Sequence, residues 1–213
     1  TMDGLQKESK KVIIKRFIGG ILESNCYIVS RSGAAGEGCF IIDPGYNPKR
    51  IIRYVKEQGM KAEGIILTHH HSDHTGAALQ TGKELGCPIM IHTLDADMYG
   101  EPVDVYLEEG QILTTGDSSE GMEVLHTPGH TEGGICLMCR KDRVCFTGDT
   151  IFNVDLGRTD LSDGSEEKMR RSIRNVVDKW GNDITVYPGH CDPATMKTVR
   201  KSNKEFLEII NGN

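Results

Sequence analysis

The sequence lacks three features that would assign it to common classes of protein. No apolar run in its 213 residues approaches the roughly 20 residues needed to cross a bilayer, so a membrane protein is not expected. Basic residues are in the minority, with 25 Lys and Arg against 31 Asp and Glu, a formal net charge of −6, and they form no basic stripe. Nucleic-acid binding, which depends on contacts with phosphates, is therefore not expected.

The start of the chain also lacks an apolar signal segment. TMDGLQKESKK is polar and rich in lysine, and it leads directly into VIIKRF. We expect residues 1–11 to be a disordered or tag-derived N-terminus and residues 12–213 to form one domain, located in the cytoplasm. The seven cysteines agree, because an odd number cannot pair completely. Cys136 and Cys139 form a CxxC, but in an extended segment they would point to opposite faces, so we expect buried thiols rather than a redox or zinc site.

Apolar runs and turn residues predict mixed strands and helices without a linker between them. Strands are predicted at 12–17, 25–30, 39–45, 63–69, 88–92, 111–117, 122–129, 135–140, 143–149 and 185–190. Helices are predicted after Pro48, at 74–86, at 165–181 and from Pro193 to residue 210. This order favours an α/β fold with two stacked sheets and helices outside them.

Four of the eight histidines fall in one short stretch, LTHHHSDHTG, between a strand-like run and a helix-like run. Zinc and similar ions bind imidazole nitrogen and carboxylate oxygen, and a site needs three or more such groups. His69 and His71 are two residues apart at a strand end, so they can face the same point. Asp73 and His74 follow as the chain turns and can face a second point. His70 alternates to the other side and is the least favoured ligand.

Three further strand ends carry a possible ligand beside a glycine. They are HTPGHT with His130, FTGDT with Asp149 and YPGH with His190. Strand ends around one mouth are where α/β folds assemble sites, and glycine lets the backbone approach closely. The candidates comprise five histidines and two aspartates, too many for one tetrahedral ion and suited to two ions that share a carboxylate. The alternative, unrelated histidines in solvated loops, requires four such strand ends to arise by chance.

Taken in order, THHHSDH, TPGHT, FTGDT and PGH resemble the signature of the metallo-β-lactamase fold superfamily, HxHxDH followed by separate His, Asp and His. The resemblance runs from NCYIV to PGH and implies a single-domain, four-layer αββα sandwich with its site at one edge between the sheets. It implies one ion held by His69, His71 and His130, a second held by Asp73, His74 and His190, and Asp149 as the shared ligand.

Two other residues are predicted to support the ligands. The DPG at 43–45 resembles the corresponding stretch of the family, and Asp43 is expected to support a ligand histidine. His126, four residues before His130, is a candidate for the same role, and the alternative is a histidine packed beneath the site.

A dinuclear site predicts hydrolysis by a metal-bound hydroxide, with Asp73 orienting the hydroxide and receiving its proton. The stretch GDTIFNVDLGRTDLSDG resembles glyoxalase II-type hydrolases (hydroxyacylglutathione hydrolases) and persulfide dioxygenases. In those relatives an Arg or Lys near Arg158 helps to hold the carboxylates of glutathione, whereas the alternative is a structural Arg158 paired with Asp160. The resemblance implies a small-molecule acyl-thiol ester, such as an acyl-glutathione, as substrate. The segment after His190 has room for one helix, whereas full-length glyoxalase II has a separate helical domain there.

The sequence leaves three alternatives open. The chain could be a persulfide dioxygenase with one iron held by His69, His130 and Asp149. It could hydrolyse lactones or other esters, or be a non-catalytic metal-binding module, which the intact ligand set disfavours. Nitrogen and oxygen ligands suit two divalent ions, with zinc expected first and iron or manganese as alternatives.

Overall fold

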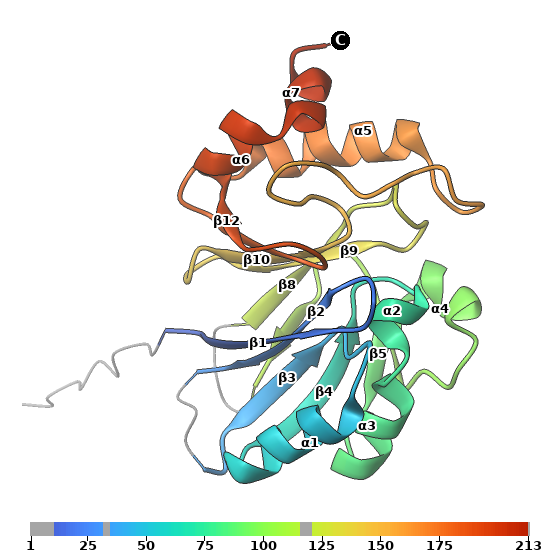
Figure 1. Ribbon diagram of the computed structural model, residues 1–213, viewed down its shortest axis with the longest axis vertical. Helices are drawn as coiled ribbons and strands as arrows, with labels where there is room; N and C mark the ends of the chain where they lie inside the picture. The colour runs from blue at the N-terminus through green and yellow to red at the C-terminus, as the bar shows by residue number, and fades with distance from the viewer. Residues whose placement is uncertain (1–10, 32–34, 116–120, 213) are drawn as a thin grey trace, which may run out of the picture.

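Two sheets packed face to face form the centre of the molecule, with helices outside each of them (Figure 1). The structure is a computed structural model that describes residues 11–31, 35–115 and 121–212. Within these residues each sheet has six strands, so the αββα sandwich predicted from the motifs is confirmed. The expectation for residues 1–11 lies outside the described residues except at Lys11.

The first sheet follows chain order from β1 to β6. Its strands are β1 (Ile13–Gly19), β2 (Ser24–Ser30), β3 (Gly38–Ile42), β4 (Lys61–Leu67), β5 (Ile89–His92) and β6 (Val105–Leu107). β1, β2 and β3 pair antiparallel, whereas β3 to β6 pair parallel. Their crossovers include α1 (Pro48–Glu57) and α3 (Ala78–Leu85), which cover the outer face (Figure 1). The parallel strands all end at one edge of the sheet.

The second sheet has the order β12-β11-β10-β9-β8-β7. Its strands are β7 (Ile112–Thr114), β8 (Gly121–His126), β9 (Ile135–Cys139), β10 (Val144–Gly148), β11 (Thr185–Pro188) and β12 (Ala194–Thr195). Its outer face is covered by α5 (Glu166–Asn175), α6 (Met196–Ser202) and α7 (Lys204–Ile210) (Figure 1). Between the two sheets, the ring of Tyr27 packs 5.3 Å from that of Phe146. Both side chains are fully buried.

Three predicted helices are shorter than the sequence pattern suggested. The segment 74–86 divides into α2 (Ser72–Thr75) and α3, and the segment 165–181 into α5 and a 3₁₀ turn at Val177–Lys179. The single terminal helix is wrong, because the chain turns extended at Asn203, with ψ 101°, and the Asn203 side chain starts α7 by accepting a hydrogen bond from the Phe206 amide. Helix α4 (Thr93–Tyr99) and β6 were not predicted.

The cysteines lie as the sequence predicted. All seven are free, and Cys191 alone among them is exposed. In β9, Cys136 packs into the core under α5, whereas Cys139 packs into the core between the sheets. The CxxC therefore spans two faces of a strand.

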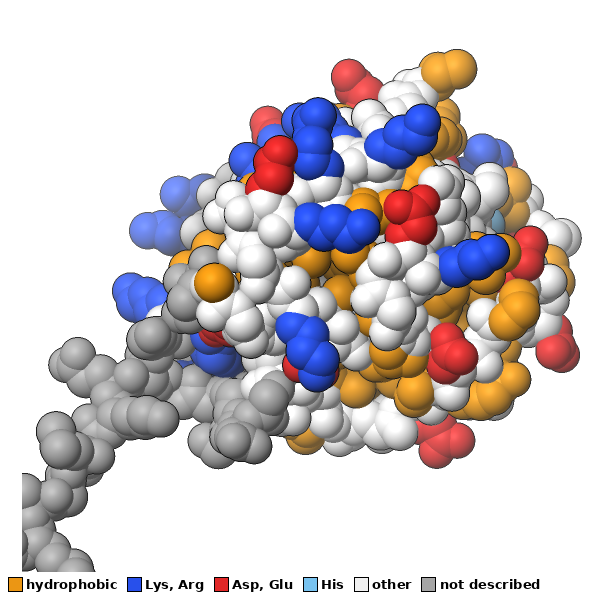
Figure 2. Space-filling model, turned by 90° about the horizontal axis from the view of Figure 1, so that it is seen from below, with side chains coloured by type: hydrophobic (Ala, Val, Ile, Leu, Met, Phe, Trp, Pro, Cys, Tyr) orange, Lys and Arg blue, Asp and Glu red, His pale blue; other side chains and the backbone are white. Residues whose placement is uncertain are grey.

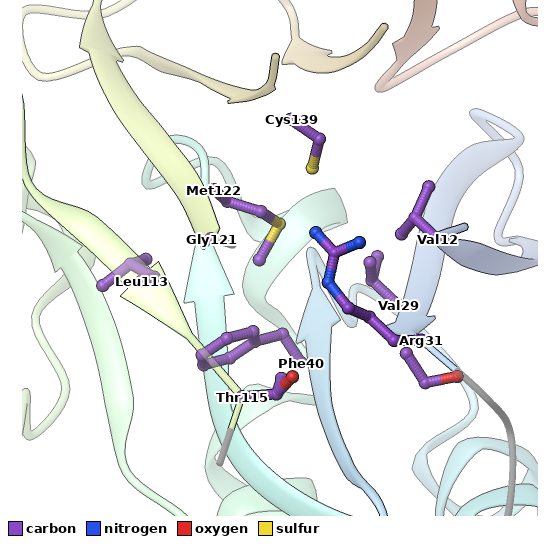
Figure 3. Close-up of a pocket in the computed structure, with 10 residues that line it drawn as sticks. Val12, Val29, Arg31, Phe40, Leu113, Thr115, Gly121, Met122 and Cys139 are labelled. Atoms are coloured by element: carbon purple, nitrogen blue, oxygen red, sulfur yellow. The ribbon is translucent and has the colours of Figure 1, made fainter. Parts of the chain in front are cut away.

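Figure 2 shows one face, on which acidic, basic and hydrophobic side chains are interspersed. A cavity of about 20 Å³ lies between the sheets at the strand ends remote from the predicted ligands, where Arg31, Phe40 and Met122 line it (Figure 3). That volume is about that of one water. Among the described residues, no helix combines the length and apolarity needed to span a membrane.

Candidate metal centre

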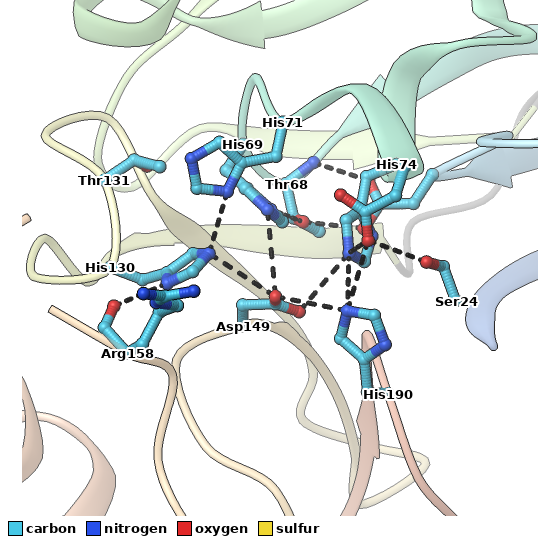
Figure 4. Close-up of polar contacts among 12 residues, drawn as sticks. Ser24, Thr68, His69, His71, His74, His130, Thr131, Asp149, Arg158 and His190 are labelled. Carbon is cyan, nitrogen blue, oxygen red and sulfur yellow. Dashed lines mark hydrogen bonds and ion pairs between the residues drawn. The ribbon is translucent and has the colours of Figure 1, made fainter. Parts of the chain in front are cut away.

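All seven side chains predicted as ligands converge at the edge of the sandwich where the inner strands end (Figure 4). His69 and His71 follow β4, His130 follows β8, Asp149 follows β10, His190 follows β11, and Asp73 and His74 lie in α2. Figure 4 shows six of them facing one another from both sheets, and the seventh, Asp73, contacts His74 and His190. The fold therefore brings together residues up to 121 positions apart in the chain.

One group of donors consists of three imidazoles. The ligand atoms of His69, His71 and His130 lie within 4.8 Å of one another. His71 Nδ1 lies 2.9 Å from His130 Nε2, which in turn lies 3.4 Å from Asp149 Oδ2. His69 Nε2 lies 3.9 Å from the same carboxylate oxygen. Three nitrogens and one carboxylate oxygen are a donor set typical of zinc or iron.

The second group contains Asp73, His74 and His190. His74 Nε2 lies 3.2 Å from His190 Nε2 and 3.2 Å from Asp73 Oδ2. Asp149 faces this group as well, with Oδ1 at 3.5 Å from His74 Nε2 and Oδ2 at 3.4 Å from His190 Nε2. Asp149 thus contacts both groups, which is the position required of a shared ligand.

Backbone carbonyls fix the orientation of two imidazoles. His130 Nδ1 lies 2.7 Å from the carbonyl oxygen of Arg158, and His190 Nδ1 lies 2.9 Å from that of Leu22. A carbonyl oxygen only accepts, so each Nδ1 carries a proton and each Nε2 is the nitrogen that faces the cluster.

Asp43 performs the corresponding function for two more imidazoles. Its Oδ2 lies 3.2 Å from His74 Nδ1 and accepts a 2.7 Å hydrogen bond from Thr68 Oγ1. Since the Thr68 hydroxyl donates to Asp43, it accepts from His69 Nδ1 at 3.0 Å. Asp43 therefore contacts His74, one of the candidate ligands. Thr68 was missed, because a hydroxyl gives no sign in the sequence of the acceptor that the fold brings to it.

The two groups differ in their affinity for protons. Burial lowers the pKa of His71 to about 4, and the neighbouring His130 lowers it further. Burial likewise holds the pKa of His69 well below its ordinary value. Burial opposes charge on His190, but Asp149 and Asp73 outweigh it and raise its pKa to about 10. His69 and His71 are therefore neutral at pH 7, whereas His190 holds a proton where a cation could bind.

The residues present fit divalent ions. His69 Nε2 and Asp149 Oδ1 are buried and have no hydrogen-bond partner. Leaving a buried polar atom without a partner costs about 1–3 kcal/mol, which a coordinated cation offsets. Ionised carboxylates and neutral imidazoles with outward lone pairs are the forms that bind metal.

Glycine next to the ligands is required by close packing. A Cβ at Gly189 would lie 2.2 Å from Asp149 Oδ1 and 2.7 Å from His74 Cε1. A side chain at this position would displace the shared carboxylate, so the glycine of YPGH is part of the site.

Arg158 lies at the rim with its guanidinium exposed. Its Nε and NH2 atoms lie 2.7 and 2.9 Å from the two carboxylate oxygens of Asp160, so the pairing alternative is observed. Arg158 also lines a cavity of about 330 Å³ together with Glu205 and Glu208 of α7. Helix α7 therefore lies beside the Arg158 loop.

His126 is not brought into the cluster. Its Nε2 lies 2.9 Å from the Glu132 carbonyl oxygen, and its ring stacks on that of His92 at 4.2 Å. This arrangement matches the alternative of a packed histidine.

Comparison with known proteins identifies the family. A model of the metallo-beta-lactamase superfamily matches residues 19–190. The chain belongs to the metallo-beta-lactamase superfamily. Membership, with the His and Asp cluster, indicates a divalent metal site in a metallo-hydrolase scaffold.

Relatives within the superfamily cover most of the chain. An uncharacterized protein of Aquifex aeolicus is 32% identical over 219 residues, 94% of this chain and 100% of that protein. The hydroxyacylglutathione hydrolase GloC of Haemophilus influenzae is 34% identical over 181 residues, 76% of this chain and 84% of that protein. The crystal structure of TTHA1623 in a di-iron-bound form is 28% identical, with a TM-score of 0.78 over 89% of this chain and 98% of that one.

Proposed function

We propose that the chain is a dinuclear metal-dependent hydrolase that cleaves a small-molecule thioester, of the acyl-glutathione type. The observation that carries this proposal is the shared carboxylate: Asp149 contacts a His group on one side and an Asp/His group on the other. The similarity to the Haemophilus hydroxyacylglutathione hydrolase supports the thioester. The di-iron-bound form of TTHA1623 supports two ions and leaves iron beside zinc and manganese as candidates.

The residues of the chain have separate tasks in this reaction. Two bound divalent ions would supply Lewis acidity and lower the pKa of a water. Asp73 accepts a 2.7 Å hydrogen bond from Ser24 Oγ, and its contacts with His190 and His74 hold its pKa far below the ordinary value, although burial opposes this. An ionised Asp73 suits a ligand that also orients the attacking water through a hydrogen bond. A thiolate is a good leaving group, so cleavage of a thioester does not require a general acid.

The rim supports a thioester with an apolar acyl group and a carboxylate-bearing thiol. Ile21 at the tip between β1 and β2 is 99% exposed, and its neighbour Leu22 carries the carbonyl that holds His190. Arg158 can exchange Asp160 for a substrate carboxylate, since a guanidinium binds either bidentately. Seven free thiols accord with the cytoplasmic location that we propose.

The test is hydrolysis of a matched substrate panel by metal-reconstituted protein. We expect thioester cleavage, and a loss of about 100-fold or more in kcat for Asp149→Asn, because the shared ligand is removed. The exposed Asp97→Asn should leave activity unchanged. An acyl-glutathione, the same acyl group on another thiol, and the matching oxygen ester separate thiol preference from esterase activity. Oxygen consumption with glutathione persulfide, without hydrolysis of any thioester, would replace the hydrolase with the persulfide dioxygenase.

A further inference from the structure

The residue Asp95 of helix α4 holds the two loops that carry the first group of ligands. It is 1% exposed, and its carboxylate accepts hydrogen bonds from both loops. From the loop after β4, the His70 amide donates to Oδ2 at 3.0 Å, and His70 Nδ1 lies 3.1 Å from the same atom. From the loop after β8, Thr131 Oγ1 donates to Oδ2 at 2.8 Å and the Gly133 amide donates to Oδ1 at 2.5 Å.

The partners of Asp95 are sequence neighbours of all three imidazoles of the first group. His70 stands between His69 and His71, and Thr131 directly follows His130. A buried carboxylate that accepts several hydrogen bonds fixes its donors more firmly than neutral partners do. The spacing of the three imidazoles therefore depends on a residue that touches none of them.

The packing around Asp95 is specific to this arrangement. A Cβ at Gly133 would lie 2.6 Å from Asp95 Oδ1, so the loop after β8 can reach the carboxylate only with glycine there. On the other side of the His70 ring, Nε2 lies 3.4 Å from Asp163 Oδ2. His70, which is the histidine of the HHH run that is not aimed at the cluster, thus lies between two carboxylates.

The second group is supported by other residues. Ser24 donates to Asp73, Asp43 contacts His74, and the Leu22 carbonyl contacts His190. No contact of Asp95 in the described residues reaches any of these side chains. Loss of Asp95 should therefore affect one ion and not the other.

We propose that Asp95 is a positioning residue of the first metal site, which sets the affinity of that site independently of the second. This inference rests on the metal centre in the proposed function. Asn has nearly the same shape as Asp, but its amide NH2 is a donor. In Asp95→Asn this NH2 would face at least one of the four groups that donate to Asp95, which are the His70 amide, His70 Nδ1, Thr131 Oγ1 and the Gly133 amide. Loss of such supporting contacts weakens metal binding about 10- to 100-fold.

The experiment is a chelator-competition titration of wild type, Asp95→Asn and Asp97→Asn, with metal retained per chain as readout. Asp97 lies on the same helix and is exposed, so it is the matched control for charge. We expect Asp95→Asn to lose one ion at a chelator concentration at which wild type and Asp97→Asn keep two. Anomalous scattering from crystals of the variant should locate the remaining ion between Asp73, His74 and His190. Ser24→Ala, which removes a hydrogen bond to Asp73, should instead weaken the second site and leave the ion between His69, His71 and His130.

If Asp95→Asn fails to fold by circular dichroism, Thr131→Val tests the same contact, because it removes one donor and should weaken the first site about fivefold. Unchanged affinity of both sites in a folded Asp95→Asn or Thr131→Val variant would overturn the inference. Wild-type protein that binds no ion would instead overturn the proposed function.

Discussion

At the scale of single residues, what distinguishes this site is how each ligand is held. The seven ligand candidates were predictable, because HxHxDH and three Gly-flanked strand ends are local patterns. Asp95 was not, since its partners lie 25 to 38 residues away and HTLDADMYG has no feature that indicates them. The carbonyls of Leu22 and Arg158 could not be predicted either, because every residue has a carbonyl. Which ring nitrogen of His130 and His190 carries the proton therefore depends on tertiary structure.

The residue scale also gives a pH prediction. His190, with its pKa raised to about 10, must lose a proton before an ion binds, whereas His71, with its pKa lowered to about 4, is already neutral. A proton on a ligand nitrogen competes with the metal ion, so a ligand with a raised pKa binds metal more weakly as the pH falls. We expect the affinity of the site that contains His190 to rise steadily from pH 6 to 9, while the affinity of the site that contains His71 changes little. Chelator competition at fixed pH values measures this, and equal slopes for the two ions would contradict it.

At the scale of elements, the sequence predicted the inner strands well and the last helices poorly. Buried strands such as β9, with the sequence ICLMC, are continuous apolar runs followed by turn residues, so their positions can be predicted. The pattern from Pro193 to residue 210 reads as one helix, because its apolar spacing is continuous. Asn203 breaks it through contacts that no local pattern contains: its Nδ2 donates to the carbonyls of Phe152 and Asp155, at 3.1 and 2.8 Å.

This break predicts a stability effect. Asn203→Ala removes the cap of α7 and leaves two carbonyls without their donor, which together should cost about 2–4 kcal/mol of unfolding free energy. Urea denaturation followed by circular dichroism measures it. The exposed Asn211→Ala is the control, with an expected change within about 0.5 kcal/mol. A loss for Asn203→Ala no larger than that of the control would show that the break contributes little.

At the scale of the whole molecule, two sheets from opposite halves of the chain supply the two sides of one site. Ligands that follow β4 meet ligands that follow β8, β10 and β11, and Asp149 lies between the two groups. The family resemblance predicted this layout, including the αββα layers. The segment after His190 contains α6 and α7, and Glu205, Glu208 and Ile209 of α7 line the cavity beside Arg158.

The most direct test of the dinuclear centre is the number of ions that the protein binds. Inductively coupled plasma mass spectrometry on protein reconstituted with zinc, iron or manganese should give two ions per chain, and one for Asp149→Asn or for a second-group variant such as His190→Ala. One iron per wild-type chain under every condition would contradict a shared-carboxylate centre and favour single-iron chemistry.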